Sequence, residues 1–473
     1  MSSTVKYLGL TLDSTLRWNQ HVDQTLTKAT KALMVCNRLA GKSWGCSPRT
    51  IRWMYTMIVR PIITYGAVSW GSKASQTSVG LKLSKLQRLA CICASGAMRT
   101  CPTAALEVML ELSPLHLVIK QTAKRTLLQM TAEGAGKGKV ISSQQMKELS
   151  EEIPLALLPR YNITKVVNFS RKFQVTLGSK SEWKDSALDL LLKGCTIKWY
   201  TDGSKTEEGI GAGVAGPSTK LSIPMGSFPS IFQAEVYAIS QCVGINLQRN
   251  YRNKSIAILS DRQSALRAIN AYEVRSLLVM ECIERLNSLS EHNQVQLIWV
   301  PGHRGIAGNE LADELARSAA STRMVGPEPY LAVGPHTIKE LLRREERADR
   351  EIHWQQLQGM HHARLLMGGY DLKRFNAIIN LPRNKFRLLV AFYTGHCRLK
   401  KHLFNMGIAS SANCRFCDIE PETPEHLLMN CTAVCRRRIK ALGSMFPHRD
   451  CIASLAPSRI LEFINMLGLD DTI

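Results

Sequence analysis

The stretch that decides the fold is Trp199-Tyr200-Thr201-Asp202-Gly203-Ser204, which opens a segment running from residue 196 to residue 320. β-Branched and aromatic residues precede Asp202, and a Gly-Ser pair follows it. This pattern predicts a β-strand that ends at the acid and turns immediately afterwards. Asp202 is therefore expected at the end of a strand.

Three further acids follow in comparable positions. Glu235 begins an apolar-periodic run that predicts the first turn of a helix. Asp261 follows a short apolar strand over residues 255–259, and Asp313 lies inside a helix expected to begin near residue 309. Side chains at the carboxyl ends of neighbouring strands converge at one edge of an α/β sheet, and helix residues can lean over that edge.

Four converging carboxylates repel one another unless cations hold them. Hard oxygen ligands of this kind can fix a pair of Mg²⁺ ions for an in-line displacement at phosphorus. The alternative is four unrelated surface acids, since exposed acids are common. The shared placement at strand and helix ends favours a two-metal site.

The order of the four acids resembles that of type 1 ribonucleases H. The likeness extends to Gln233-Ala234-Glu235 and to the block Trp299-Val300-Pro301-Gly302-His303, which precedes Asn309-Glu310-Leu311-Ala312-Asp313. It implies that Asp202, Glu235, Asp261 and Asp313 are catalytic acids that bind two Mg²⁺ ions, for which Mn²⁺ can substitute. It also implies that His303 lies on a mobile loop and assists product release or proton transfer. Cellular members carry asparagines just before the second acid, whereas this chain has Ile231-Phe232.

The expected fold of residues 196–320 is a central α/β ribonuclease H-like mixed sheet of five strands. We predict antiparallel strands at 196–201, 209–216 and 219–225, a helix from 231, a strand at 255–260, helices between 262 and 290, a strand at 294–300 and a helix from 309. The strand at 255–260 should lie parallel to the first one, because a crossover helix joins them.

The charge of the chain is concentrated on both sides of this segment. The 473 residues, enough for about three domains, carry a net charge of +23. Residues 1–131 contain 17 Lys and Arg against 4 Asp and Glu, residues 196–342 contain 14 against 14, and residues 343–473 contain 20 against 13. Basic flanks predict a polyanionic partner, namely RNA, DNA or an RNA–DNA hybrid, although ordinary solubilising charge is the alternative.

Composition also suggests where the protein acts. Charged residues interrupt every apolar stretch well short of a membrane span, and Met1 is followed by no basic-then-apolar leader. We therefore expect an intracellular protein of the nucleus or cytoplasm that is not secreted and has no membrane partner. The 14 cysteines are then expected as reduced thiols with one metal site.

Residues 1–131 predict a mainly helical region, with a strand at 4–12 and helices at 21–39, 48–60, 80–95 and 115–130, the second ended or kinked by Pro61. Tyr7-Leu8-Gly9-Leu10-Thr11-Leu12-Asp13, Pro61-Ile62-Ile63-Thr64-Tyr65-Gly66-Ala67 and Trp70 resemble the thumb or connection region that follows the palm of non-LTR retrotransposon reverse transcriptases. A palm needs two adjacent aspartates in a strand turn, but the chain offers only Asp470-Asp471 near its end. We expect a back part of a larger reverse transcriptase polyprotein, without a polymerase site.

Residues 132–195 are expected to form a linker or connector, with a Gly/Lys run at 134–139. Residues 337–473 predict a helical basic region that starts with a charged helix at 337–358 and contains a CCHC zinc motif at 414–431. Cys414, Cys417, His426 and Cys431 supply four ligands for a closed, structural Zn²⁺ site. The motif resembles the C-terminal zinc module of insect-type non-LTR elements; a few buried cysteines are the alternative. Arg436-Arg437-Arg438 would suit phosphate contact.

Two functions are consistent with these features. The first is an endoribonuclease that cleaves the RNA strand of RNA–DNA hybrids by two-metal-ion hydrolysis, as part of a retrotransposon polyprotein. The second is a nucleic-acid-binding remnant or domesticated fragment with little or no catalytic activity. The ribonuclease H-like loop around His303 disfavours a DNA nuclease or an integrase-like relative.

Overall fold

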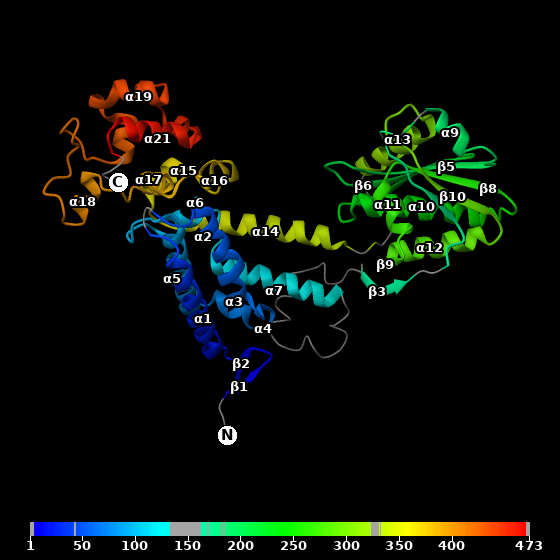
Figure 1. Ribbon diagram of the computed structural model, residues 1–473, viewed down its shortest axis with the longest axis horizontal. Coiled ribbons are helices and arrows are strands. Elements are labelled where there is room, and N and C mark those ends of the chain that lie inside the picture. The colour runs from blue at the N-terminus through cyan, green and yellow to red at the C-terminus, as the bar shows by residue number, and fades with distance from the viewer. Residues whose placement is uncertain are drawn as a thin grey trace. The chain divides into compact units, whose positions relative to one another are not determined.

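The computed structural model describes residues 4–41, 44–132, 162–167, 170–179, 181, 183, 185–322, 331 and 333–469. The chain divides into two compact units: Met1–Thr126 with Leu342–Ile473, and Leu127–Leu341 (Figure 1). Within the described ranges no helix is both long and apolar enough to cross a membrane. The Gly/Lys run at 134–139 and the pair Asp470-Asp471 lie outside those ranges.

A six-stranded mixed sheet forms the centre of the second unit, with the order β4-β10-β8-β5-β6-β7. Its strands are β4 (Gln174–Thr176), β5 (Ile197–Lys205), β6 (Ile210–Gly216), β7 (Thr219–Gly226), β8 (Ser255–Ser260) and β10 (Gln294–Trp299). The antiparallel β5-β6-β7 arrangement and the parallel pairing of β8 with β5 match the prediction.

The prediction of five strands was wrong by one. β4 lies inside the predicted connector and pairs in parallel with β10, so that Gln174 faces Gln296 and Thr176 faces Ile298 across the pair. Three residues are too few to display an alternating pattern, so this strand has no signature in the sequence. It forms because it pairs with β10.

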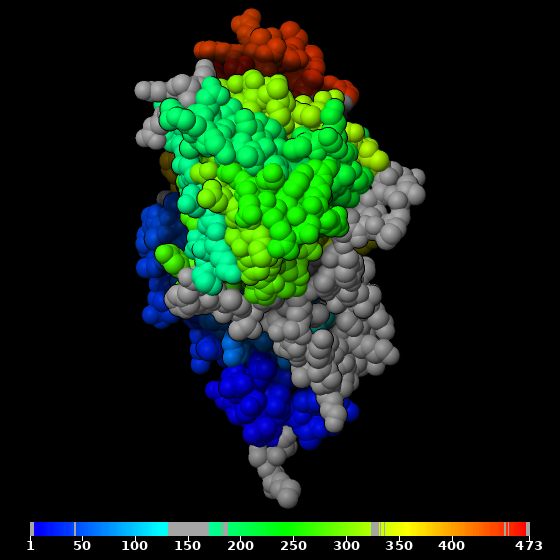
Figure 2. All heavy atoms as spheres, turned by 90° about the vertical axis from the view of Figure 1, so that its right-hand side faces the viewer, coloured from blue at the N-terminus to red at the C-terminus, as the bar shows by residue number. Residues whose placement is uncertain are grey.

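Helices cover both faces of the sheet (Figure 1). They are α9 (Asp185–Leu191), α10 (Ile231–Gln248), α11 (Gln263–Ile269), α12 (Leu277–Ser290) and α13 (Ala307–Ser321). Along β8, Ile256 and Ile258 join the large core cluster that includes residues of α10, α11 and α12, whereas Ala257 and Leu259 join the smaller cluster with Leu192. This alternation follows the two-residue period of a strand, and both faces of β8 are buried. In Figure 2 the green atoms of this unit form one closely packed surface.

Close approach of α13 to β6 depends on glycine. A Cβ atom at Gly213 would overlap the carbonyl oxygen of Ala312, and one at Gly211 would overlap the backbone of Ala316. Ala212 and Val214, which alternate with these glycines, are fully buried on the opposite face. The helix that carries Asp313 can therefore lie directly on the sheet.

A short antiparallel pair also belongs to this unit. β3 (Asn162–Val167) pairs with β9 (Glu273–Ser276), which precedes α12. The stretch 262–290, for which only helices were predicted, therefore contains a strand as well.

Residues 1–126 and 342–473 form the other unit. Its elements are β1 (Thr4–Tyr7), β2 (Leu10–Asp13), α1 (Asn19–Asn37), α2 (Pro48–Met54), η1 (Tyr55–Val59), α3 (Arg60–Thr64), α4 (Ala67–Trp70), η2 (Gly71–Ser75), α5 (Thr77–Ser95), α6 (Thr103–Met109), α7 (Leu115–Ala132), α14 (Pro335–Gln356), α15 (His361–Met367), α16 (Leu372–Ile378), α17 (Arg383–Thr394), α18 (Lys400–Asn405), η4 (His426–Asn430), η5 (Thr432–Val434), α19 (Cys435–Leu442), α20 (Arg449–Ser454) and α21 (Pro457–Met466), of which α7 and α14 extend past the unit's limits.

Buried polar contacts join the first and last parts of the chain within this unit. The guanidinium of Arg383 donates hydrogen bonds to the carbonyl oxygens of Gly41 (2.6 Å) and Ala94 (3.1 Å). Arg350 pairs with Glu111 at 2.9 Å. Because hydrogen bonds from a charged, largely buried donor contribute about 1.5–3 kcal/mol each, these contacts hold the two stretches together as one body.

One local prediction for residues 4–64 was wrong, and one of the two outcomes predicted at Pro61 is excluded. The single strand at 4–12 is a hairpin, because Leu8 and Gly9 adopt positive φ angles of 45° and 83° and reverse the chain. Pro61 does not end its helix: the π-helical turn η1 precedes it, and α3 continues to Thr64 with the proline near its first position. Proline is tolerated there because no intrahelical N–H bond is required of it.

Candidate functional site

Strand register brings two of the predicted acids together. In the parallel pairing of β5 with β8, Thr201 faces Ser260, so Asp202 and Asp261 are the next residues along two neighbouring strands. The prediction that β5 ends at Asp202 was wrong. The strand continues to Lys205, because Asp202 pairs with Gly213 of β6 on its other side.

Glu235 reaches the same edge from α10. Ser230 caps this helix in a capping box with Gln233, which fixes the helix start and places Glu235 in the second turn rather than the predicted first. One carboxylate oxygen from each of Asp202, Glu235 and Asp261 lies within 4.8 Å of the others. Asp202 and Glu235 are buried, with 6% and 1% of their surface exposed.

Asp313 lies beside this group but does not belong to it. Its carboxylate pairs with Arg317 one helical turn later, and the Nδ1 atom of His303 lies 4.0 Å from its Oδ2 atom. Its negative charge nevertheless acts on Asp202. The structure therefore gathers three acids closely and places the fourth at their margin.

The electrostatics of the group favour bound cations. Burial raises the pKa of Asp202 to about 7, with contributions from the negative charges of Asp261 and Asp313. Burial also raises the pKa of Glu235 well above its ordinary value, and Asp202 and Asp261 add to the effect. Arg262, whose Nε atom lies 3.9 Å from Glu235 Oε1, opposes the shift only in part.

The donor atoms suit Mg²⁺. The Oε2 atom of Glu235 is buried and, among the described residues, lacks a hydrogen-bond partner. A buried carboxylate oxygen without a partner is costly, and a hard divalent cation with oxygen ligands would relieve that cost together with the mutual repulsion of the acids.

The loop after β10 is shaped by its contact with the acids. Gly302 lies so close to Asp261 that a Cβ atom at this position would stand 2.5 Å from Asp261 Oδ2. The next residue, His303, has a φ angle of 57° and a side chain that is 77% exposed. Left-handed backbone is uncommon outside glycine. In this conformation the loop presents the imidazole of His303 to solvent beside Asp313.

A cavity of about 590 Å³ adjoins Asp261. Phe232, Arg262, Gln263, Ser264 and Trp299 complete its lining. It offers an aromatic surface and a cation next to the carboxylates, and Phe232 is one of the two residues that stand where the resembled cellular enzymes carry asparagines.

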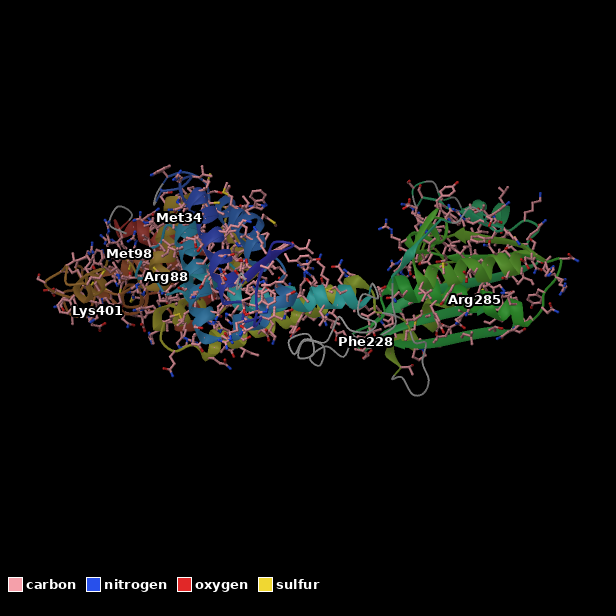
Figure 3. All side chains as sticks on the ribbon, turned by 90° about the horizontal axis from the view of Figure 1, so that it is seen from below. Met34, Arg88, Met98, Phe228, Arg285 and Lys401 are labelled. Carbon is pink, nitrogen blue, oxygen red and sulfur yellow. The ribbon has the colours of Figure 1, made fainter. Side chains whose placement is uncertain are left out.

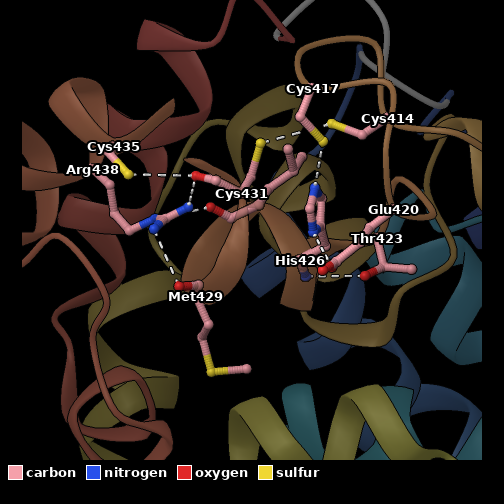
Figure 4. A network of polar contacts seen from close by, with 10 residues as sticks. Cys414, Cys417, Glu420, Thr423, His426, Met429, Cys431, Cys435 and Arg438 are labelled. Atoms are coloured by element: carbon pink, nitrogen blue, oxygen red, sulfur yellow. Dashed lines mark hydrogen bonds and ion pairs between the residues drawn. The ribbon is translucent and has the colours of Figure 1, made fainter. Parts of the chain in front are cut away.

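The predicted zinc ligands form a second cluster, in the other unit. Cys414, Cys417, His426 and Cys431 each offer a ligand atom within 4.8 Å of the others. Cys417 Sγ lies 3.3 Å from His426 Nε2, and Cys414 Sγ lies 3.9 Å from Cys431 Sγ (Figure 4). Sulfur atoms bound tetrahedrally at about 2.3 Å from one ion stand about 3.8 Å apart, so the spacing fits zinc.

Neighbouring side chains hold this cluster. Glu420 Oε2 lies 2.7 Å from His426 Nδ1, the ring nitrogen that faces away from the cysteines (Figure 4). Such a carboxylate orients a ligating imidazole. Arg438 is fully buried and donates hydrogen bonds to the carbonyl oxygens of Met429 and Cys431. The prediction that Arg438 contacts phosphate was therefore wrong, because its guanidinium is used inside the fold.

Sequence reasoning missed several neighbours of these sites. Arg262 directly follows Asp261, and Arg317 lies one helical turn after Asp313, so adjacency and the i, i+4 rule could have indicated both. Glu420 carries no such signal, because it reaches His426 only through the loop between them.

Comparison with known proteins agrees with this geometry. Residues 195–321 match the family model described as RNase H. Over 118 residues, a quarter of the chain, the sequence is 30% identical to a Drosophila melanogaster protein described as a putative 115 kDa protein in type-1 retrotransposable element R1DM. That match spans 12% of the relative's length. Residues 195–321 are therefore a ribonuclease H domain, in a chain related to a retrotransposable-element protein.

Proposed function

We propose that this domain hydrolyses the RNA strand of RNA–DNA hybrids with two Mg²⁺ ions, or Mn²⁺ in their place. The observation that carries the proposal is the meeting of Asp202, Glu235 and Asp261 from three separate elements at one sheet edge. Groups whose pKa values are strongly shifted by burial and like charge are typical of catalytic sites.

Each residue of the site has a separate task. Asp202, Glu235 and Asp261 would hold the cations, with Asp313 as the fourth acid at the margin. When bound, the two ions activate the attacking water and stabilise the leaving oxygen, which leaves 5′-phosphate and 3′-hydroxyl ends. His303, exposed beside Asp313, would transfer a proton or assist product release. Burial of Asp202 and Glu235 keeps water from competing for their oxygens.

A basic groove in the other unit supports a nucleic-acid partner. Two adjoining cavities of about 510 Å³ each share Arg99. Arg88 also lines one of them, and Arg387 and Arg398 line the other, beside Arg383, whose guanidinium is bonded inside the fold. Figure 3 shows Arg88 in this unit with Met34 and Met98, two apolar lining residues. Burial and the neighbouring charge of Arg398 lower the pKa of Arg387. No acidic residue is among the described residues that line either cavity, so a phosphate backbone would be attracted there.

We further propose that Cys414, Cys417, His426 and Cys431 bind one structural Zn²⁺. Cys417 is the ligand best prepared for this. Burial raises the pKa of its thiol, but hydrogen bonds from the backbone N–H groups of Glu420 and Ile419, and then the contact with His426, lower it to about 6. A thiolate is the form that zinc binds. The larger proposal, that the chain belongs to a retrotransposon polyprotein, is supported by the match to the retrotransposable-element protein.

The nuclease proposal is tested by Mg²⁺-dependent cleavage of three substrates of equal sequence: hybrid, duplex RNA and duplex DNA. Wild type should cleave only the RNA of the hybrid, and Asp261→Asn should reduce the rate by at least a hundredfold. Glu281→Gln, which neutralises an exposed acid of α12, is the matched control and should cleave normally. Unimpaired hybrid binding without any cleavage by wild type would instead favour the alternative, a nucleic-acid-binding remnant.

A further inference from the structure

A third group of metal-binding side chains lies outside both sites described above. His361, His362 and Glu425 each offer a ligand atom within 4.8 Å of the others. His361 and His362 are the first two residues of α15, and Glu425 immediately precedes the turn η4 that carries His426. All three belong to the unit that contains residues 342–473.

The two imidazoles face one carboxylate oxygen. The Nδ1 atoms of His361 and His362 lie 3.7 and 3.8 Å from Glu425 Oε2, which is beyond hydrogen-bond distance. Ligand atoms bound about 2.1 Å from a tetrahedral ion stand about 3.4 Å apart. A contraction of a few tenths of an ångström would therefore allow one ion to replace the two missing hydrogen bonds.

A second observation points to a ligand at this place. The Nδ1 atom of His362 is buried and has no hydrogen-bond partner among the described residues. Leaving a buried polar nitrogen unsatisfied costs about 1–3 kcal/mol. His361 is exposed over 76% of its side chain and Glu425 over 30%, so an ion could enter from solvent and keep a water ligand on its open side.

Backbone geometry at the start of α15 orients the two histidines. Gly359 and Met360 both have positive φ angles, 81° and 57°, so the chain turns sharply before the helix. Adjacent side chains on a helix normally diverge, yet here the first two rings lie with centroids 5.9 Å apart in an edge-to-face arrangement, and both approach Glu425.

We propose that His361, His362 and Glu425 bind a second divalent transition-metal ion, of which Zn²⁺ is the most suitable. Two imidazole nitrogens and one carboxylate oxygen are the donor set of three-ligand zinc sites that retain a water molecule, whereas Mg²⁺ prefers oxygen alone. The ion cross-links α15 to the segment that bears the Cys/His cluster. This site is separate from the nuclease acids and does not depend on the proposed activity.

The test is a cobalt titration of the full, metal-stripped chain under reducing conditions. Two tight equivalents are expected, one with the strong thiolate-to-cobalt absorption of the Cys/His cluster and one with the weaker bands of nitrogen and oxygen ligands. The nuclease acids offer only oxygen and should bind cobalt more weakly than either group. Reconstitution with zinc should give a content about one equivalent above that of the Cys/His cluster alone.

Variants assign the second equivalent. His361→Ala changes an exposed side chain and should fold normally; it should lose one equivalent and keep the thiolate absorption. His292→Ala, an exposed histidine between α12 and β10, is the control and should lose nothing.

Three results would overturn the proposal. These are unchanged stoichiometry in both His361→Ala and Glu425→Gln, binding of the second equivalent only at millimolar metal, and loss of the weaker bands equally in His292→Ala.

Discussion

Replacing Asp202 with asparagine should stabilise the metal-free ribonuclease H domain while abolishing its activity. Burial and the nearby charges of Asp261 and Asp313 raise the pKa of Asp202 from 3.8 to about 7. An ionised Asp202 is therefore unfavourable in the folded protein without metal. Asparagine has the same size and carries no charge, so the variant avoids this cost but cannot hold two cations.

The magnitude follows from the shift and depends on pH. One pKa unit corresponds to about 1.36 kcal/mol. Because the folded pKa is raised, the protonated form stabilises the fold below pH 4, and this stability is lost as the pH rises through 7. Relative to asparagine, the wild-type residue should cost about 4 kcal/mol at pH 8 but only about 0.5 kcal/mol at pH 4. The cost at pH 8 is an upper bound, since the neighbouring acids can relax.

Hydrogen-exchange mass spectrometry of peptides from β5 measures this effect in the second unit alone. In EDTA at pH 8, Asp202→Asn should slow exchange up to about a thousandfold relative to wild type at the same pH. The gain should nearly vanish at pH 4, and Mg²⁺ should protect wild type but not the variant. Equal protection of the two proteins at pH 8, or a gain of the same size at both pH values, would refute the reasoning. Glu281→Gln serves as the exposed control.

Four further outcomes are expected. Gly213→Ala should cost about 1–3 kcal/mol in urea unfolding, because the methyl group overlaps α13. Gly244→Ala in α10, where a Cβ atom would meet only the end of the Arg285 side chain at 3.9 Å, should be neutral or stabilising. His303→Ala should slow hybrid cleavage only partially, without changing the Mg²⁺ concentration needed for half-maximal rate; complete loss would assign it a larger role. Cys414→Ser should lose its zinc by elemental analysis and unfold residues of about 410–435 while cleavage continues; a variant that keeps its zinc would contradict the ligand set. Hybrid affinity should fall steeply with salt in wild type and in Asp202→Asn alike, and a flat salt dependence would exclude phosphate contacts by the basic flanks.

The sequence by itself determined the elements that carry the proposed catalytic acids. Asp202, Glu235 and Asp261 are recognisable because each follows or begins a run with a clear strand or helix period, and such periods reflect local backbone geometry. The spacing of Cys414 and Cys417 is likewise a local property. The excess of basic residues on both sides of residues 196–342 can be counted from the sequence alone.

Tertiary structure decided what depends on contacts between distant residues. β4 exists because β10 offers an edge to three residues that have no strand pattern of their own. Arg438 belongs to a run of three arginines of the kind expected at the surface. Its guanidinium is nevertheless buried and donates a hydrogen bond to the carbonyl oxygen of Cys431. The margin position of Asp313 follows from how α13 packs on β5, β6 and β7, and the meeting of His361 and His362 with Glu425 follows from a turn at Met360. Long-range pairing depends on how complementary surfaces pack, and no periodicity within a single segment encodes that.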